Sequence, residues 1–118
     1  MRCAILLPFP PGLNNLFKNI RRGRARTDRY QAWIAEATRQ ILAQNPQRIC
    51  GSFRAELRFE RPDRRKRDLD GLAKAPLDLL VRAGVIDDDH LAERLVLVWS
   101  DVPPSKPGSL LVMLEACS

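Results

Sequence analysis

The sequence lacks the residue patterns that build zinc sites, disulfide frameworks and glycine-rich phosphate loops. Its three cysteines, Cys3, Cys50 and Cys117, lie far apart and include no C-x-x-C pair, so neither a zinc knuckle nor a disulfide framework is expected. The one histidine, His90, has no second histidine to join it and is expected at the surface rather than as a ligand. Without a glycine-rich phosphate loop, an enzyme for a small phosphorylated substrate is a weak hypothesis.

Long apolar runs are also absent. The apolar amino-terminal stretch is cut by Pro8, Pro10 and Pro11, which predicts that the chain has neither a signal peptide nor a membrane-spanning segment. A length of 118 residues indicates a single domain, residues 1–118, that folds without disulfides or structural metals. Together with the cysteine usage, these features favour a cytoplasmic location.

Acidic residues are scarce in the first part of the chain. Residues 1–67 hold sixteen Arg and Lys against five Asp and Glu, whereas residues 68–118 hold four against nine. Sixteen of the twenty basic residues are arginine, and its planar guanidinium suits phosphate groups. The first part is therefore expected to bind a polyanion, with nucleic acid as the leading partner, and the second part to bind cations.

The hydrophobic pattern predicts four strands and two helices. A strand over residues 2–7 precedes a long loop over residues 8–27 and a helix over residues 28–44. Apolar and charged residues alternate at 53–60, as in a strand with one buried face. A second helix is predicted over residues 69–83, and strands at 95–99 and 110–114 are expected to pair as a hairpin.

These elements predict an α+β fold. Their order, strand, helix, strand, helix, strand, strand, indicates a mixed sheet of about four strands with the two main helices packed on it. Tyr30 and Trp33 have core-facing spacing on the first helix, so both are expected to pack rather than to stack on bases. Pro76 is awkward inside the second helix and costs about 3 kcal/mol there, unless that helix begins later or its first turn is irregular.

Six aspartates and a lysine lie between residues 67 and 89. Spacing by four would place Asp70, Lys74, Asp78 and Arg82 as alternating charges along one helix face, which is a purely structural role. That role leaves Asp68 unexplained. It also does not explain the acidic run at 87–89, and the structural alternative for that run is an ordinary acidic loop.

Asp68 and Asp70 are two residues apart at a junction between a strand and a helix. Both carboxylates can point the same way there, and the following helix is long enough to bring a later aspartate back to them. Mg²⁺ takes carboxylate oxygens and keeps several waters, so two or three aspartates and a substrate phosphate can form its shell. Lys74 would stabilise charge on a phosphodiester, or orient or deprotonate the attacking water. The pattern predicts metal-assisted phosphodiester hydrolysis.

Several short motifs lie in order along nearly the whole chain. They are Leu-Pro-Phe-Pro-Pro at 7–11 with Asn14-Asn15, Arg-Asp-Leu-Asp at 67–70 with Lys74 and Asp78, Ala83-Gly84, and Asp88-Asp89. This set of motifs resembles the RusA family of Holliday-junction resolvases. The resemblance implies a homodimeric endonuclease that makes paired nicks in four-way DNA junctions, in DNA recombination and repair, with Mg²⁺ or Mn²⁺. Val96 and Val98 are candidate positions for the dimer interface.

The same resemblance assigns the site residues. It implies metal binding by Asp68, Asp70 and Asp89 and a catalytic role for Lys74. Three consecutive acids leave the register open, so Asp88 is an alternative or additional ligand. Gly71 stands where the family usually has Asn.

The resemblance also implies that the basic segments meet DNA. The residues concerned are Asn14, Lys18, Arg21, Arg22, Arg24, Arg26, Arg64, Arg65, Lys66 and Arg67. The structural alternatives are a flexible solvated arm at 8–27 and a solvated loop or localisation signal at 64–67. The alternative function is a non-catalytic basic protein that binds branched DNA, with salt-sensitive binding that is independent of divalent metal.

Overall fold

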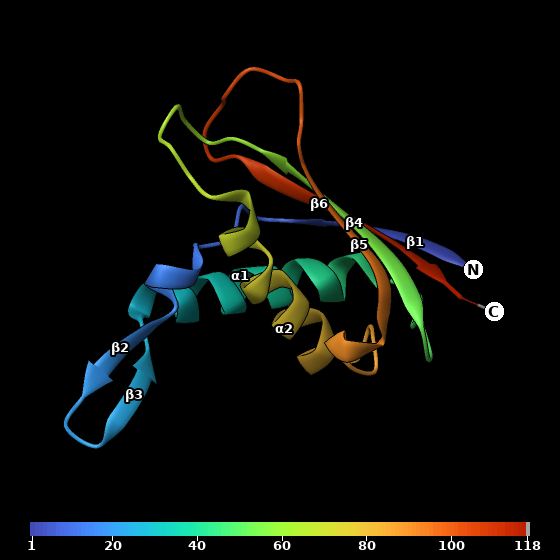
Figure 1. The fold of residues 1–118 in the computed structure, drawn as a ribbon, viewed down its shortest axis with the longest axis horizontal. Coiled ribbons are helices and arrows are strands. Elements are labelled where there is room, and N and C mark those ends of the chain that lie inside the picture. The colour runs from blue at the N-terminus through green and yellow to red at the C-terminus, as the bar shows by residue number, and fades with distance from the viewer. Residues whose placement is uncertain (118) are drawn as a thin grey trace.

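A four-stranded mixed sheet forms the framework of the protein (Figure 1). The structure is a computed structural model and describes residues 1–117. Its elements, in chain order, are β1 (Arg2–Leu7), η1 (Leu13–Asn15), β2 (Phe17–Ile20), β3 (Gly23–Arg26), α1 (Asp28–Gln44), β4 (Phe53–Glu60), η2 (Leu69–Leu72), α2 (Lys74–Arg82), η3 (Asp89–Leu91), β5 (Ala92–Trp99) and β6 (Ser109–Ala116), where η marks a 3₁₀ turn. The predicted α+β class and the mixed sheet are confirmed.

Both helices lie on one face of the sheet, and the core is the layer between them (Figure 1). The alternation predicted for residues 53–60 is confirmed, because Phe53, Ala55, Leu57 and Phe59 of β4 are all buried. Ile5 and Leu7 of β1 and three residues of β6 join them: Leu110, Val112 and Leu114. Within residues 1–117, neither helix has the length and apolar composition needed to cross a bilayer.

α1 begins and ends almost where the sequence predicts. Thr27 is its N-cap, and its hydroxyl accepts a hydrogen bond from the Tyr30 N–H at 3.1 Å. Tyr30 and Trp33 are buried, and the Trp33 indole N–H donates to the Pro8 carbonyl at 3.0 Å. The helix ends at Gln44, and its C-cap Asn45 has a left-handed backbone with φ of 47°. Both aromatic side chains therefore pack in the core, as predicted.

Residues 8–27 are not the long loop that the sequence predicts. They contain η1 and an antiparallel hairpin of β2 and β3, which projects away from the sheet and helices (Figure 1). Arg21 and Arg22 form its turn, and Gly23 follows with a φ of 118° that favours glycine. The Phe17 ring packs edge-on against Tyr30 with centroids 5.8 Å apart. This contact and the strand pairing hold a segment whose composition alone suggested disorder.

The second helix begins later than predicted. Residues 69–72 form η2 instead, and α2 starts at Lys74. Pro76 is thus the third residue of α2, in the first turn, where backbone N–H groups have no acceptor within the helix. The helix ends at Arg82, and Gly84 follows its C-cap with a φ of 76°, while the Val85 N–H donates to the Leu80 carbonyl at 2.9 Å. The later start removes the cost expected for Pro76.

The predicted hairpin of residues 95–99 with 110–114 is wrong. The spatial order is β1-β6-β4-β5, so β6 lies between β1 and β4 while β5 pairs with β4 in parallel. The segment 100–108 carries the chain from the sheet edge past β4 to reach β6. As a result, β5 is an edge strand, and α2 with its flanking turns forms the crossover from β4 to β5.

Candidate active site

Asp68 and Asp70 sit at the turn that leads into α2. Asp68 precedes η2 with an extended backbone, and Asp70 lies within it. Both residues are exposed, and the Asp68 side chain caps no backbone N–H of η2. Within residues 1–117, neither carboxylate takes part in a salt bridge. Two exposed carboxylates with no salt-bridge partner among the described residues are a donor set that suits a hard divalent cation.

Lys74 opens α2 one turn after Asp70. Its ammonium group lies 3.3 Å from the carboxylate of Asp78. This is the one contact of the predicted ladder of alternating charges that forms in the described part of the chain. The Lys74 side chain is 50% exposed, and pairs of this kind contribute only a few tenths of a kcal/mol. A phosphate can therefore replace Asp78 as the partner of Lys74 at little cost.

The three consecutive acids at 87–89 have different surroundings. Asp87 pairs with the guanidinium of Arg48 and accepts the Gly51 N–H at 2.9 Å. These bonds, first that from Gly51 and then that from Arg48, lower the pKa of Asp87. Asp87 therefore ties the segment before β4 to the segment before β5, which is a structural role.

Asp88 is also engaged locally. It caps η3 by accepting the His90 N–H at 3.2 Å, and it lies 3.1 Å from Nδ1 of the His90 ring. The His90 side chain and then its backbone N–H lower the pKa of Asp88 to about 2. Asp89, the first residue of η3, has no salt bridge within residues 1–117. Of the two candidate ligands, Asp89 is the one without a salt bridge among residues 1–117, although its side chain, after those of His90, also lowers the pKa of Asp88.

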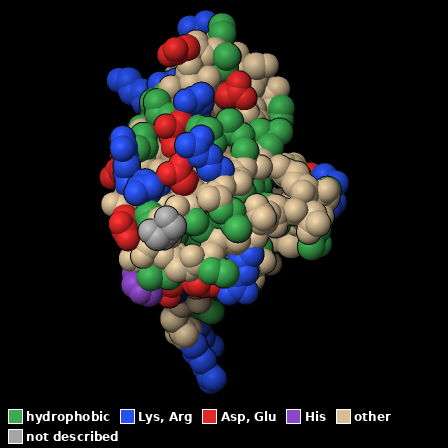
Figure 2. All heavy atoms as spheres, turned by 90° about the vertical axis from the view of Figure 1, so that its right-hand side faces the viewer, with side chains coloured by type: hydrophobic (Ala, Val, Ile, Leu, Met, Phe, Trp, Pro, Cys, Tyr) green, Lys and Arg blue, Asp and Glu red, His purple; other side chains and the backbone are tan. Residues whose placement is uncertain are grey.

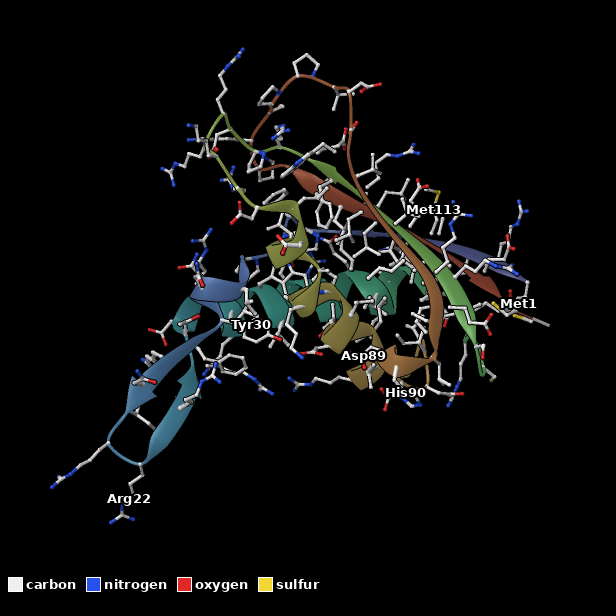
Figure 3. The ribbon with its side chains drawn as sticks, viewed as in Figure 1. Met1, Arg22, Tyr30, Asp89, His90 and Met113 are labelled. Atoms are coloured by element: carbon white, nitrogen blue, oxygen red, sulfur yellow. The ribbon has the colours of Figure 1, made fainter. Side chains whose placement is uncertain are left out.

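The two acidic halves do not meet within one chain. Residues 1–117 contain no group of three or more Asp, Glu, His or Cys side chains that could hold a metal ion. η2 precedes α2, whereas Asp89 lies beside the carboxyl-terminal end of that helix (Figure 3). The nine residues of α2 span about 13 Å, while ligand oxygens lie about 2 Å from a bound Mg²⁺. The expected return of a later aspartate to Asp68 and Asp70 does not occur in the single chain.

The basic loop after β4 is braced from within. The carboxylate of Asp63 accepts two bonds from the Arg67 guanidinium, at 2.7 and 3.2 Å. Arg67 also lies over the Phe9 ring, 5.3 Å from its centroid, and its side chain is only 18% exposed. It therefore holds the loop in shape, and the exposed cations are its neighbours Arg64, Arg65 and Lys66. The sequence reasoning missed Asp63, although its spacing of four from Arg67 was a signal.

The remaining predicted DNA contacts gather on the hairpin. Lys18, Arg21, Arg22, Arg24 and Arg26 are all exposed, and none forms a salt bridge with another residue of 1–117. Figure 2 shows basic side chains at the tip of the hairpin, below the rest of the molecule. Figure 3 places Arg22 at the turn of the hairpin.

The base of the hairpin adjoins the acidic turn. Asn14 is exposed on η1. A Cβ added to Gly71 of η2 would lie 3.8 Å from the Cβ of Leu13 of η1. The arm and the candidate metal ligands are therefore joined through packed neighbours.

Comparison with known proteins decides the family. Residues 8–107 match the family described as endodeoxyribonuclease RusA. The chain belongs to the RusA family. A crossover junction endodeoxyribonuclease of Enterobacteria phage HK97 is 32% identical to it over 116 residues, covering 94% of each chain.

Bacterial members of the RusA family are similar to the same extent. The proteins of that name from Escherichia coli K12 and Shigella sonnei are 32% and 35% identical over 110 and 111 residues, which cover 91% of this chain and 88% of each relative. The RusA match spans the hairpin, the acidic turn, α2 and η3. The family identified from sequence motifs is therefore confirmed.

Proposed function

We propose that the protein resolves four-way DNA junctions by hydrolysing phosphodiester bonds at paired sites with a divalent metal, in DNA recombination and repair. The observation that carries this proposal is the placement of Asp68, Asp70 and Lys74. These residues match the RusA motif and lie together on the exposed turn into α2, with neither carboxylate in a salt bridge inside the described chain. Relatives that align over most of their length carry the name crossover junction endodeoxyribonuclease.

The donor set fits Mg²⁺ or Mn²⁺ as the metal. Asp68 and Asp70 would hold the ion through carboxylate oxygens and leave its other positions to water and phosphate. Bound there, such an ion polarises a phosphate and lowers the pKa of a bound water. Lys74 supplies a positive charge one helical turn from Asp70, where it stabilises the charge that develops on the phosphodiester. The exposed cations of residues 64–66 hold the adjoining DNA backbone.

We also propose that the site is completed by a second copy of the chain. Within residues 1–117, Asp89 does not join Asp68 and Asp70 in a group that could hold a metal ion, so a homodimer would supply it from the partner. A two-fold dimer then carries two such sites, which is what symmetric cleavage of a two-fold junction requires. Val96 and Val98 lie on β5, the edge strand that follows η3 directly. An interface along β5 would bring η3 of one copy, which carries Asp89, close to η2 of the other copy.

Junction cleavage tests the proposed activity. The wild-type protein is incubated with a labelled four-way junction or a linear duplex of the same sequence, in Mg²⁺, in Mn²⁺ and in chelator. We expect paired cuts in the junction with either metal, far less cutting of the duplex and none in chelator. A folded protein that binds the junction but never cuts it would instead support the non-catalytic DNA-binding alternative.

A further inference from the structure

We propose that the β2–β3 hairpin enters the branch point of a DNA junction and that Ile20 at its tip inserts against the unstacked faces of the base pairs there. The inference rests on the proposed function. It names the part of the chain that would distinguish branched DNA from linear DNA. Four observations carry it: the anchoring of the hairpin, its charge, the exposure of Ile20 and the surroundings of that side chain.

The hairpin is an anchored arm rather than a loose loop. At its base the Thr27 N–H donates to the Leu16 carbonyl at 2.9 Å, and the Thr27 hydroxyl donates to the Asn15 carbonyl at 2.6 Å. Leu16 is fully buried, and Phe17 packs on Tyr30 of α1. The Arg24 guanidinium lies over the Phe17 ring at 4.5 Å and stiffens the ribbon. An arm held in this way can deliver its tip to a defined place.

The charge of the hairpin suits the centre of a junction. Its five basic residues have no acid among them, because residues 1–27 contain no Asp or Glu. Phosphates of several strands converge where duplex arms meet, so a projecting cationic arm is drawn there more strongly than to a single duplex. The arm is also a two-stranded ribbon, a shape that fits between DNA strands.

Ile20 is an exposed apolar side chain at the end of this cationic arm. It is the last residue of β2, it is 48% exposed, and its cross-strand partner Gly23 has no side chain to cover it. On the same face of the ribbon, Lys18 pairs with Ala25, so the nearest large neighbour is a cation. An arm that served only phosphates would gain nothing from an isoleucine at its tip. Apolar side chains flanked by cations are the type that proteins insert between base steps, which unstacks them.

Fluorescence of 2-aminopurine tests the insertion without requiring cleavage. The probe is placed in the DNA, either at the branch point of a junction or in the middle of one of its duplexes, and protein is added in chelator. We expect wild-type protein to raise the fluorescence of the branch-point probe several-fold and that of the mid-duplex probe hardly at all. Ile20→Ser should lose most of the rise while Kd changes by less than about tenfold, because phosphate contacts supply most of the affinity.

Leu42→Ser is the matched control, since Leu42 is 75% exposed on α1, away from the arm. It should behave as wild type, and unchanged melting temperatures of both variants show that folding is intact. An Ile20→Ser protein that raises the branch-point signal as wild type does would overturn the assignment. Wild type that cuts junctions without unstacking the probe would also overturn it, whereas unstacking without cleavage in Mg²⁺ would count against the proposed activity alone.

Discussion

At the scale of single residues, the aspartates between 67 and 89 divide into two groups. Three are held by partners in the same chain: Asp78 by Lys74, Asp87 by Arg48 and Gly51, and Asp88 by His90. The other three form no salt bridge within residues 1–117, although the chain has a net charge of +6: Asp68, Asp70 and Asp89. A surplus of arginine offers many partners, so carboxylates left without one are the best candidates for binding a metal.

Replacing Asp70 by Asn removes a charge without changing the size of the side chain. We expect cleavage of the junction to fall by about 10²-fold or more, the scale seen when one charge-stabilising group is lost from an active site. Binding should stay equal or tighten, because one negative charge fewer faces the phosphates. Junction cleavage is measured in Mg²⁺, and binding is measured by gel shifts in chelator. The control Asp101→Asn, in the exposed loop after β5, should change neither cleavage nor binding. An Asp70→Asn protein that loses binding together with cleavage would contradict a metal-binding role for Asp70.

Gly71 can be replaced by Asn, the residue that the resemblance to the RusA family leads us to expect there. Its φ is not in the left-handed region, and a Cβ there would meet Leu13 only at 3.8 Å, an ordinary contact. We expect Gly71→Asn to change the free energy of unfolding by less than about 1 kcal/mol. Gly108→Ala is the contrasting control: its φ is 74° and its Cβ would lie 2.8 Å from the Glu60 carbonyl oxygen. That variant should lose about 1–3 kcal/mol in urea unfolding, and equal losses in both variants would contradict this account.

The Asp63 carboxyl makes stability depend on pH. The Arg67 side chain, then the Arg65 N–H, lower its pKa to about 2, against about 3.9 for an unfolded Asp. A group whose pKa falls on folding stabilises the protein above its unfolded pKa, and this contribution is lost as pH drops from about 4 to 2. Asp63→Asn should therefore be less stable than wild type near neutral pH, with the difference shrinking across that range. Urea midpoints from pH 7 down to about 2 measure it, and a constant difference would contradict the linkage.

At the scale of elements, local patterns could be predicted and non-local pairing could not. The alternation of β4 and the core stripe of α1 identify those elements because each residue's burial follows from its place in the period. The apolar run of β5 carries no information about its neighbour, and the parallel partner β4 lies across a crossover. The nine residues between β5 and β6 were a hint, since hairpin loops commonly have two to five. The β2–β3 hairpin was not predicted because its strands are short and because the contact that stabilises it, Phe17 on Tyr30, is tertiary.

The hairpin should contribute to DNA binding through phosphates. Replacing Arg21 and Arg22 together by Ala is expected to weaken binding of all junction sequences and to reduce the slope of log K against log salt. The reduction should be about 0.9 for each phosphate contact that is lost. Fluorescence anisotropy over a range of salt measures the slope. Arg39→Ala, which removes an arginine paired with Glu36 on α1, should leave it unchanged, and an unchanged slope in the double variant would exclude phosphate contacts there.

At the scale of the whole molecule, the sequence predicts candidate site residues but not where they lie relative to one another. The motifs point to Asp68, Asp70, Lys74 and Asp89 because a motif depends only on the order of residues along the chain. Whether a later aspartate reaches the earlier pair depends on the length and direction of α2, and the late start of that helix leaves η2 and η3 at its two ends. If a second copy completes the site, as we propose, the local pattern of one chain does not encode that arrangement.

Mixing two inactive variants tests the central claim most directly. Asp70→Asn and Asp89→Asn chains carrying different tags are refolded together, and the mixed dimer is isolated through both tags. If each site combines η2 of one copy with η3 of the other, the mixed dimer has one intact site and one site with both substitutions. We therefore predict that each variant alone leaves labelled junctions uncut, while the mixed dimer nicks one strand in Mg²⁺. A mixed dimer that binds junctions but makes no nick, or cleavage by either variant alone at the wild-type rate, would contradict the account.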